Sequence, residues 1–464
     1  MARASRAALL VDASDYFASL EQALCRAEHS ILILGWDFDA RIKLCPGRED
    51  CLPLGQFLRS LVDTKPDLHV HILVWSFAVI HAPGAPLPLL LGEAWQDHPR
   101  ITLRLDREHP VYASHHQKVV CIDDSLAFVG GIDLTVHRWD TCGHEEEHAE
   151  RVDPDGAVYS PVHDVQMMVA GEAARALSDV VRERWQLTLQ TVPPSALQSD
   201  AIWPPTIKPD LINVPVAVAR TAPGWRGAPA VQEVAHLTLD MLAAARRTIY
   251  IEAQYFTARV IRDWMEKSLA ARSGPEIVIV IKRSLPGLLE RFVMGGNRDR
   301  VVRRLRHADR HNRLRVFYPV VEGRCGACEV SVHAKVLIID NRIMRIGSSN
   351  LNNRSMGLDT ECDVAIEAHD DETCEAIAGI RNRLLGEHLN VSADALRLAA
   401  ASDRSLIRTI DRLNRGSRGL RPLPERRLSG PLRSIAGTWL LDPPGPIIPS
   451  WWRRKALSAR RGRR

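Results

Sequence analysis

Long hydrophobic runs are absent from this 464-residue sequence, and no stretch approaches the roughly 18 to 20 unbroken apolar residues that span a bilayer. Near the N-terminus only residues 8–11 form an apolar run before Asp12, which is too short for the core of a secretory signal. Cysteine is also scarce, with nine residues in the whole chain. Because this number is small and odd, the cysteines do not form a disulfide framework. We therefore expect a reduced, cytoplasmic protein without a membrane-spanning helix.

Metal-binding patterns are few as well. Cys325 and Cys328 form the one CxxC pair, and His333 is the only candidate ligand near them. A zinc site needs a second pair of ligands, so two thiols in a Gly-rich loop are the favoured interpretation over zinc or redox chemistry. No convincing cluster of carboxylates suggests another metal. The sequence predicts neither a metal nor a cofactor.

Lysine is rare, since only eight of the 61 basic residues are Lys. Charge is also uneven: residues 401–464 carry sixteen basic and four acidic side chains, a net +12, so residues 1–400 carry −7. Within this basic tail, arginines at helical spacing lie opposite an apolar face, and tryptophans follow: Arg404, Arg408, Arg412 and Arg415; Leu406, Ile407, Ile410 and Leu413; Trp439, Trp451 and Trp452. The tail is either solvated or, as we expect, docks peripherally on an anionic membrane.

What remains is ordinary globular composition, with 45% hydrophobic and 25% charged residues. Periodicity predicts helices alternating with strands, typical of an α/β fold with a mixed, largely parallel sheet flanked by helices. The expected strands include 31–36, 69–75, 119–122, 248–254, 276–282 and 336–339. The chain divides into two similar halves with a site between them: 1–190, a Pro-rich linker and start of the second half at 191–230, 231–392, and the tail at 393–464.

One motif occurs in both halves. His116 and Lys118 are followed by Asp123, and His333 and Lys335 are followed by Asp340, each in the pattern H-x-K-x4-D. The offset of 217 residues matches the 218-residue offset between strands 31–36 and 249–254. Each motif leads through an apolar strand to small residues, Gly130-Gly131 and Gly347-Ser348, followed by Asp133 and Asn350. Two copies in register within a lysine-poor chain indicate a functional repeat.

This pair of motifs predicts one pocket with two imidazoles and two ammonium groups. In a strand, a His and a Lys two residues apart point to the same face, so pairing the halves brings both sets together. Lysines offset the charge of a phosphodiester. One His can attack phosphorus and the other can transfer protons, without a metal.

The doubled motif closely resembles the phospholipase D superfamily over about residues 8–392. Further segments are similar to the eukaryotic-type branch: GGIDL at 130–134 with RWD at 138–140, HDV at 163–165, IYIE at 249–252, and NLNNRSM at 350–356 running to Glu361. The resemblance implies that His116 is the nucleophile and His333 the acid/base. It also implies that an acid downstream of each motif hydrogen-bonds the histidine and fixes its tautomer. We expect Glu361 to do so for His333 and Asp140 for His116, with the glutamates at 145–147 as alternatives to Asp140.

Supporting roles are expected for the remaining motif residues. Asp123 and Asp340 belong to the catalytic motif but should support it rather than touch substrate, whereas Asn350 should bind or orient phosphate. Asp133 occupies the equivalent position in the first half and is also expected to bind or orient phosphate, although an acid there departs from the symmetry of the repeat. His163 is as compatible with a structural role as with a catalytic one.

The predicted function is a phospholipase D-like phosphodiesterase that cleaves or exchanges phospholipid head groups through a phosphohistidine. A cardiolipin-synthase-like phosphatidyltransferase shares the same site. A metal-independent nuclease is less favoured, because such enzymes commonly dimerise to assemble two motifs, and nucleic acid is therefore an unlikely partner. A non-enzymatic lipid-binding scaffold is the last alternative. With both motifs in one chain, we expect an active monomer.

Overall fold

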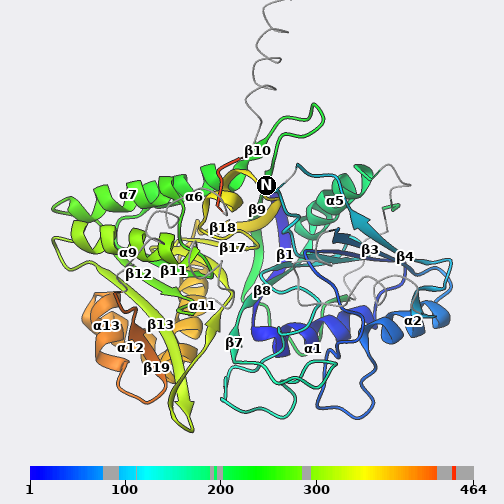
Figure 1. Ribbon diagram of the computed structural model, residues 1–464, viewed down its shortest axis with the longest axis horizontal. Coiled ribbons are helices and arrows are strands. Elements are labelled where there is room, and N and C mark those ends of the chain that lie inside the picture. The colour runs from blue at the N-terminus through cyan, green and yellow to red at the C-terminus, as the bar shows by residue number, and fades with distance from the viewer. Residues whose placement is uncertain are drawn as a thin grey trace, which may run out of the picture.

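The computed structural model describes residues 1–76, 94–110, 112–188, 193–195, 202–284, 294–425 and 442–445. Two halves lie side by side, each built on a mixed β-sheet with helices packed against it (Figure 1). The α/β class predicted from the alternation of elements is therefore confirmed. No helix in the described ranges has the length and apolarity that a membrane crossing requires.

The first half follows the predicted alternation of strands and helices. Its strands are β1 (Ala2–Val11), β2 (Ser30–Gly35), β3 (His69–Trp75), β4 (Ile101–Asp106), β5 (Val119–Ile122), β6 (Leu126–Gly130), β7 (Val162–His163) and β8 (Val165–Gly171). Its helices are α1 (Asp12–Leu24), α2 (Leu54–Thr64), the short 3-10 helix η1 (Ala94–Gln96) and α5 (Glu172–Gln186). The main sheet has the order β4-β3-β2-β5-β6-β8-β1, and only β2, β3 and β4 pair in parallel.

The second half repeats this plan. Its strands are β9 (Leu211–Ala222), β10 (Val231–Gln232), β11 (Thr248–Ala253), β12 (Glu276–Ile281), β13 (Leu314–Gly323), β14 (Gly326–Glu329), β15 (Ser331–Val332), β16 (Lys335–Ile339), β17 (Ile343–Gly347), β18 (Glu361–Glu367) and β19 (Gly419–Pro422). Its helices are α6 (Glu233–Ala244), α7 (Arg259–Ala270), α9 (Gly296–Ala308), α10 (Asn353–Gly357), α11 (Asp371–Leu389), α12 (Ala393–Asp403) and α13 (Leu406–Leu413). The sheet order is β13-β12-β11-β16-β17-β18-β9, and β11, β12 and β13 are the parallel strands.

Strand β9 joins the two sheets. Its first part, Leu211–Val216, pairs with β1, and residues 217–221 pair with β18. One core cluster continues across this seam, including Leu34 and Val165 from the first half and Ile338 and Leu384 from the second. Two further clusters lie under the outer helices of each half. The halves therefore share a buried interface, which fixes the site that forms between them.

Residues 393–423 correct the expectation of a separate tail beginning at 393. Helix α13 forms where an amphipathic helix was expected, but Leu406, Ile407 and Ile410 are buried in the central cluster rather than presented to a membrane. Strand β19 then pairs antiparallel with β13, and Leu420 is fully buried. The apolar face of α13 is used inside the protein because a helix with one apolar face buries it against the nearest available core. Trp439, Trp451 and Trp452 lie outside the described residues.

Candidate active site

The motif histidines lie just before strands rather than within them. His116 precedes β5, and its backbone N–H donates to the carbonyl of Thr360 in the other half (3.0 Å). His333 precedes β16, and its backbone N–H donates to the carbonyl of His163, again across the seam (2.8 Å). The expectation that each His and Lys share one strand face is therefore wrong. Each histidine leaves its own sheet and is held by the opposite half.

Both motifs meet at one cavity of about 440 Å³. His116, Lys118 and His333 of the motifs line it together with aromatic, cationic and polar side chains from both halves, and Lys335 hydrogen-bonds the lining residue Gln254. The lining residues are Trp36, Ser114, His116, Lys118, Asp133, Arg138, Gln254, Tyr255, Lys282, Met294, His333, Asn350, Asn352, Arg354, Ser355, Asp359 and Glu361. A concave site with an excess of cations suits an anionic substrate.

Each catalytic-type histidine contacts an acid from the other half. Nδ1 of His116 lies 3.0 Å from Oε2 of Glu361, and Nδ1 of His333 lies 2.6 Å from Oδ2 of Asp164. The predicted pairing of Glu361 with His333 is therefore wrong, and so is the pairing of Asp140 with His116. Asp164 stands in the quoted HDV segment, but sequence reasoning gave it no role. Because each Nδ1 is engaged, Nε2 is the nitrogen left for substrate.

The crossed pairing follows from the backbone. β7 and β15 form a two-stranded parallel sheet across the seam, in which Val332 pairs with His163. His115 and Thr360 form an isolated parallel bridge at the equivalent place. The carbonyl of His163, just before Asp164, accepts from the backbone N–H of His333. In the same way, the carbonyl of Thr360, just before Glu361, accepts from the backbone N–H of His116. Backbone pairing thus places Asp164 beside His333 and Glu361 beside His116.

Burial sets the protonation of these pairs. It lowers the pKa of His116 well below its usual value, and the positive charges of Lys118 and Lys335 add to this effect. Burial also raises the pKa of Glu361 to about 8, although hydrogen bonds from the hydroxyls of Ser348 (2.5 Å) and Ser355 (2.6 Å) oppose the shift. The pKa of His333 is likewise lowered, first by burial and then by Lys335. In the free protein both imidazoles are therefore neutral near pH 7.

The two lysines differ in their partners. Nζ of Lys118 lies 3.1 Å from Oδ2 of Asp133, which makes a buried ion pair. Lys335 donates to the amide oxygen of Gln254 (3.3 Å) and to the carbonyl of His333. At the sequence position equivalent to Asp133, the second half has Asn350. Burial lowers the pKa of Lys335 to about 7, partly offset by the charge of Asp164.

Asp133 and Asn350 share one backbone role. Oδ1 of Asp133 accepts from the N–H of Trp36 (2.9 Å), just beyond β2, and Oδ1 of Asn350 accepts from the N–H of Tyr255 (3.3 Å), beyond β11. The repeat is therefore preserved in position, and both residues line the cavity. The departure from symmetry lies in charge, because Asp133 is a carboxylate that pairs with Lys118, whereas Asn350 is a neutral amide.

Asp123 and Asp340 do not line the cavity. Asp123 accepts three backbone N–H groups at the start of β2, those of Glu28, His29 and Ser30, at 2.6 to 2.9 Å. Asp340 does the same at the start of β11 for residues 246–248, at 2.6 to 2.7 Å. As expected, they support the motif, and they do so from the opposite end of the strands. They tie each motif hairpin to the parallel strand that pairs with it, β2 in the first half and β11 in the second.

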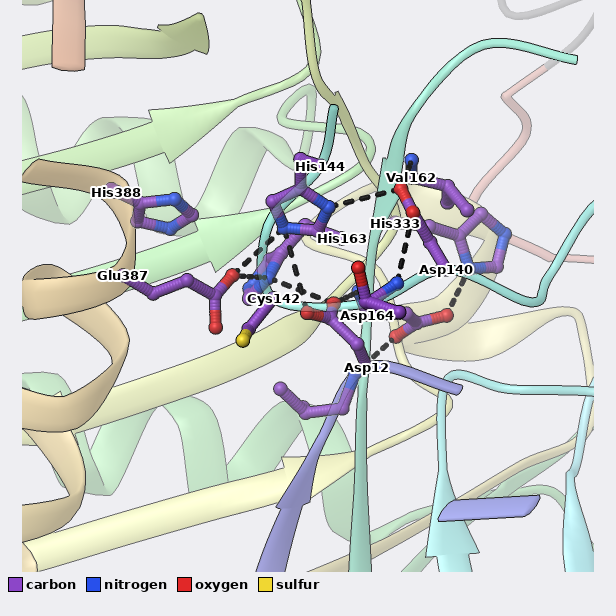
Figure 2. A network of polar contacts seen from close by, with 12 residues as sticks. Asp12, Asp140, Cys142, His144, Val162, His163, Asp164, His333, Glu387 and His388 are labelled. Carbon is purple, nitrogen blue, oxygen red and sulfur yellow. Dashed lines mark hydrogen bonds and ion pairs between the residues drawn. The ribbon is translucent and has the colours of Figure 1, made fainter. Parts of the chain in front are cut away.

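Asp140 and His163 belong to a buried network behind the cavity (Figure 2). Asp140 binds the guanidinium of Arg151 (2.9 Å) and lies 3.0 Å from Nδ1 of His144. His163 lies 2.8 Å from both Glu387 and Glu252, so it links the first half to α11 and β11. His163 is therefore in a structural position, directly before Asp164.

Two groups in this network have the composition of metal ligands: Asp12, His144, His163 and Glu387, and His163, Glu252 and His388. Sequence reasoning missed both because their members are far apart along the chain. Their ligand atoms are paired with one another, as at His144 Nε2 and Glu387 Oε1 (2.9 Å). Neighbouring carboxylates raise the pKa of His144 to about 9 against the effect of burial, which favours an imidazolium in this position. The arrangement is that of a buried ion network between the halves.

Further cavity residues had no assigned role in the sequence. Arg354 pairs with Asp359 (2.7 Å), and Asp359 accepts the backbone N–H of Ser114 (2.8 Å), which fixes the chain leading to His116. Arg138 and Lys282 add positive charge to the lining. Arg138 and Arg354 lie inside the quoted RWD and NLNNRSM segments, which was the available signal.

Comparisons with known proteins show which sequences and folds this chain is similar to. The family described as "Cardiolipin synthase, PLD-like domain" matches residues 238–384. Similar curated proteins include Phospholipase D1 of Schizosaccharomyces pombe, 24% identical over 83% of this chain and 35% of that protein. Phospholipase D A of Dictyostelium discoideum is 22% identical over 78% of this chain and 33% of that protein. The chain thus spans about a third of the length of these relatives.

Among solved structures, a phosphatidylserine synthase from Haemophilus influenzae Rd KW20 has a similar fold. Its TM-score is 0.57 at 12% identity, covering 83% of this chain and 88% of the other. The fold and the site define a class of proteins in which two similar α/β halves enclose one cavity and each half supplies one H-x-K motif. The PLD-like domain match and the similarity to curated phospholipases D over most of the chain support the phospholipase D superfamily.

Proposed function

We propose that this protein is a phospholipase D-like phosphodiesterase that cleaves or exchanges the head group of a phospholipid. One observation carries the proposal: His116, Lys118 and His333 line a single cavity, Lys335 hydrogen-bonds Gln254 in its wall, and each histidine contacts an acid at Nδ1. Two imidazoles fixed in this way match the needs of a nucleophile and a proton-transfer group.

In the first step, Nε2 of His116 attacks phosphorus. A P–N bond forms while the P–O bond to the head group breaks, and the departing alkoxide takes a proton from His333. The products are a phosphatidyl-histidine and a free head-group alcohol. Lys118 and Lys335 stabilise the charge on the non-bridging oxygens as it grows.

In the second step, His333 takes a proton from water or an alcohol, whose oxygen attacks phosphorus. The P–N bond breaks and releases phosphatidate, or a transphosphatidylated lipid, and His333 is protonated again. The lowered pKa of His116 suits a neutral nucleophile. Binding of the anionic phosphodiester raises the pKa of His333 and makes it a usable acid in the first step.

Lipid product analysis tests the proposal. The protein is incubated with a mixed phospholipid extract, with and without a primary alcohol, and the lipids are identified by mass spectrometry. Phosphatidate, and the alcohol's phosphatidyl ester when alcohol is present, are expected. A folded protein that changes no common phospholipid would contradict the proposal, and cleavage of DNA in chelator would favour a nuclease.

Transfer to a lipid acceptor is the second candidate. It is favoured by the match of residues 238–384 to a domain family described by cardiolipin synthase. Incubation with phosphatidylglycerol alone separates the two, because a transferase yields cardiolipin and glycerol whereas a hydrolase yields phosphatidate.

Peripheral membrane association from the cytoplasmic side is part of the proposal. Since α13 buries its apolar face, the polybasic end at 446–464 is the remaining candidate contact. Each basic residue near an anionic surface contributes about 1 kcal/mol, and salt screens it. Co-sedimentation with anionic liposomes across a salt series, with and without residues 446–464, measures this. Equal sedimentation of both chains rejects the end as the contact.

We also propose that the monomer is active, because both motifs come from one chain. Mixing the inactive His116→Asn and His333→Asn chains should then fail to restore activity. Recovery on mixing would indicate a site completed by a second copy.

A further inference from the structure

A second cavity of about 440 Å³ lies in the second half, at the far end of β11 from the active site. The active-site cavity is lined by Gln254, just beyond the C-terminal end of β11, whereas the second cavity is lined by Thr248 at its N-terminal end. The two cavities have no lining residue in common. The second cavity is therefore a separate site, which the proposed reaction does not use.

Arginine dominates this second cavity. Five arginines line it from three separate parts of the chain: Arg246 and Arg247 before β11, Arg381 on α11, and Arg397 and Arg404 on and after α12. Arg246, Arg247, Arg397 and Arg404 are exposed. Arg397 forms an exposed ion pair with Asp394 (3.3 Å), and the guanidinium of Arg246 donates to the carbonyls of Ala243 and Ala245. Five cations from distant segments are brought together only by the fold.

The acids in the second cavity are already engaged by the protein. Asp340 accepts the backbone N–H groups of residues 246–248. Glu276 accepts from the hydroxyl of Ser405 (2.5 Å) and from the backbone N–H of Ile407 (3.1 Å). Only these two carboxylates line the cavity among the described residues, so the positive charges exceed the negative ones by three.

Arg381 is the decisive residue. It is only 5% exposed, yet its guanidinium donates to the amide oxygens of Asn341 and Asn382, and it forms no ion pair with any carboxylate in the described part of the chain. Burial lowers its pKa to about 10. A buried charge is costly unless an opposite charge compensates it. Among the described residues no carboxylate forms an ion pair with Arg381, so an anionic ligand in the cavity would supply the missing compensation.

We propose that the cavity formed by Arg246, Arg247, Arg381, Arg397 and Arg404 binds a phosphate group, either as inorganic phosphate or as a phosphate monoester. Guanidinium groups bind phosphate oxygens in a bidentate geometry, which makes arginine the preferred residue for such recognition. The volume accommodates a phosphate and a small substituent. The bound anion would join α12 to α11 and to the loop before β11.

Thermal unfolding of the full chain tests the site. Inorganic phosphate is titrated against chloride at matched ionic strength, so that general screening is equal in both series. Phosphate should raise the midpoint of unfolding in the wild type. In the double variant Arg247→Gln with Arg404→Gln, the phosphate concentration that gives half of the full shift should rise by about tenfold or more. Binding is weaker because each lost hydrogen bond to a charged group is costly.

Two controls separate this site from the others. Arg310→Gln removes an exposed arginine outside the cavity and should keep the wild-type response. Lys335→Ala removes a cation that hydrogen-bonds Gln254 in the wall of the active-site cavity, and this variant should also keep the wild-type response. If Lys335→Ala abolishes the response and the double arginine variant does not, phosphate binds only in the active site and the proposal is overturned.

Arg381→Met gives a second test that is independent of the exposed arginines. It should abolish the response to phosphate, while the midpoint without phosphate should not fall, because an uncompensated buried charge is removed. A large loss of midpoint without phosphate, with the response to phosphate intact, would overturn the proposal.

Vesicles identify the source of the phosphate. A response to inorganic phosphate supports a site for the free anion. Without that response, binding to phosphatidylcholine vesicles only when they contain phosphatidate, lost in Arg247→Gln with Arg404→Gln, supports a lipid monoester. If the protein responds neither to inorganic phosphate nor to phosphatidate vesicles, the proposal is overturned.

Discussion

The two halves of the active site use the same backbone plan with different charges. Lys118 forms an ion pair with Asp133, whereas Lys335 hydrogen-bonds the neutral side chain of Gln254. Glu361 contacts His116 and is supported by two serine hydroxyls, whereas Asp164 contacts His333 in front of a buried ion network. A repeat therefore preserved the positions of the groups while their electrostatics diverged. This divergence is what two histidines with different tasks require.

The strongest test of the comparison removes each histidine in turn. His116→Asn and His333→Asn should each reduce phospholipid turnover by at least about 1,000-fold, since the reaction needs both a nucleophile and an acid. A phosphodiester with a nitrophenol leaving group distinguishes them, because that group departs without a proton. His333→Asn should then trap a phosphohistidine, detected by mass spectrometry, and His116→Asn should not. Trapping only in His116→Asn would reverse the roles.

Removing the acids tests the crossed contacts. Asp164→Asn and Glu361→Gln should each lower kcat by about 100-fold or more, because the imidazole loses the group that fixes its tautomer. Glu147→Gln, an exposed residue among the rivals considered from sequence, should leave kcat unchanged. In the nitrophenol assay, Glu361→Gln should slow formation of the phosphohistidine and Asp164→Asn should spare it. Equal effects on that step would remove the distinction between the halves.

The C-terminal helices belong to only one of the two halves, and their packing can be tested by stability. Ile410→Ala should lower the free energy of unfolding by about 2 to 5 kcal/mol, since Ile410 is fully buried in the central cluster. Leu398→Ala, on the neighbouring α12, should change it little because Leu398 is 63% exposed. Urea denaturation measures both. If Ile410→Ala lowers the free energy of unfolding no more than Leu398→Ala does, α13 is not part of the core.

The smallest effect concerns pH. The pKa of Lys335 is lowered to about 7 by burial, so the protonated form is lost, and kcat/KM should fall, as pH rises through about 7. Asn350→Asp would provide the carboxylate that Asp133 provides for Lys118, raise the pKa of Lys335, and move this limb to higher pH by about one unit. Gln254→Leu is the matched control, because it removes a neutral partner. An unmoved limb in Asn350→Asp would show that another group causes it.

Local pattern predicted the elements well because their apolar spacing is a local property. His69–Trp75 and Val119–Ile122 are strands with the predicted limits, and the strand predicted at 248–254 is β11 at Thr248–Ala253. The end of the chain was predicted less well. The same amphipathic spacing that forms α13 is compatible with a membrane surface or with a protein core, and only the partner distinguishes them.

The sequence by itself determined the α/β repeat and the residues of the two H-x-K-x4-D motifs, because spacing and residue type are written along the chain. Tertiary structure decided which acid serves which histidine. Asp164 is 169 residues from His333, and Glu361 is 245 residues from His116. These contacts form only when β7 pairs with β15, and when Thr360 forms a β-bridge with His115 and accepts the backbone N–H of His116 across the seam. Contacts between distant segments depend on backbone pairing between the halves, which no local pattern encodes.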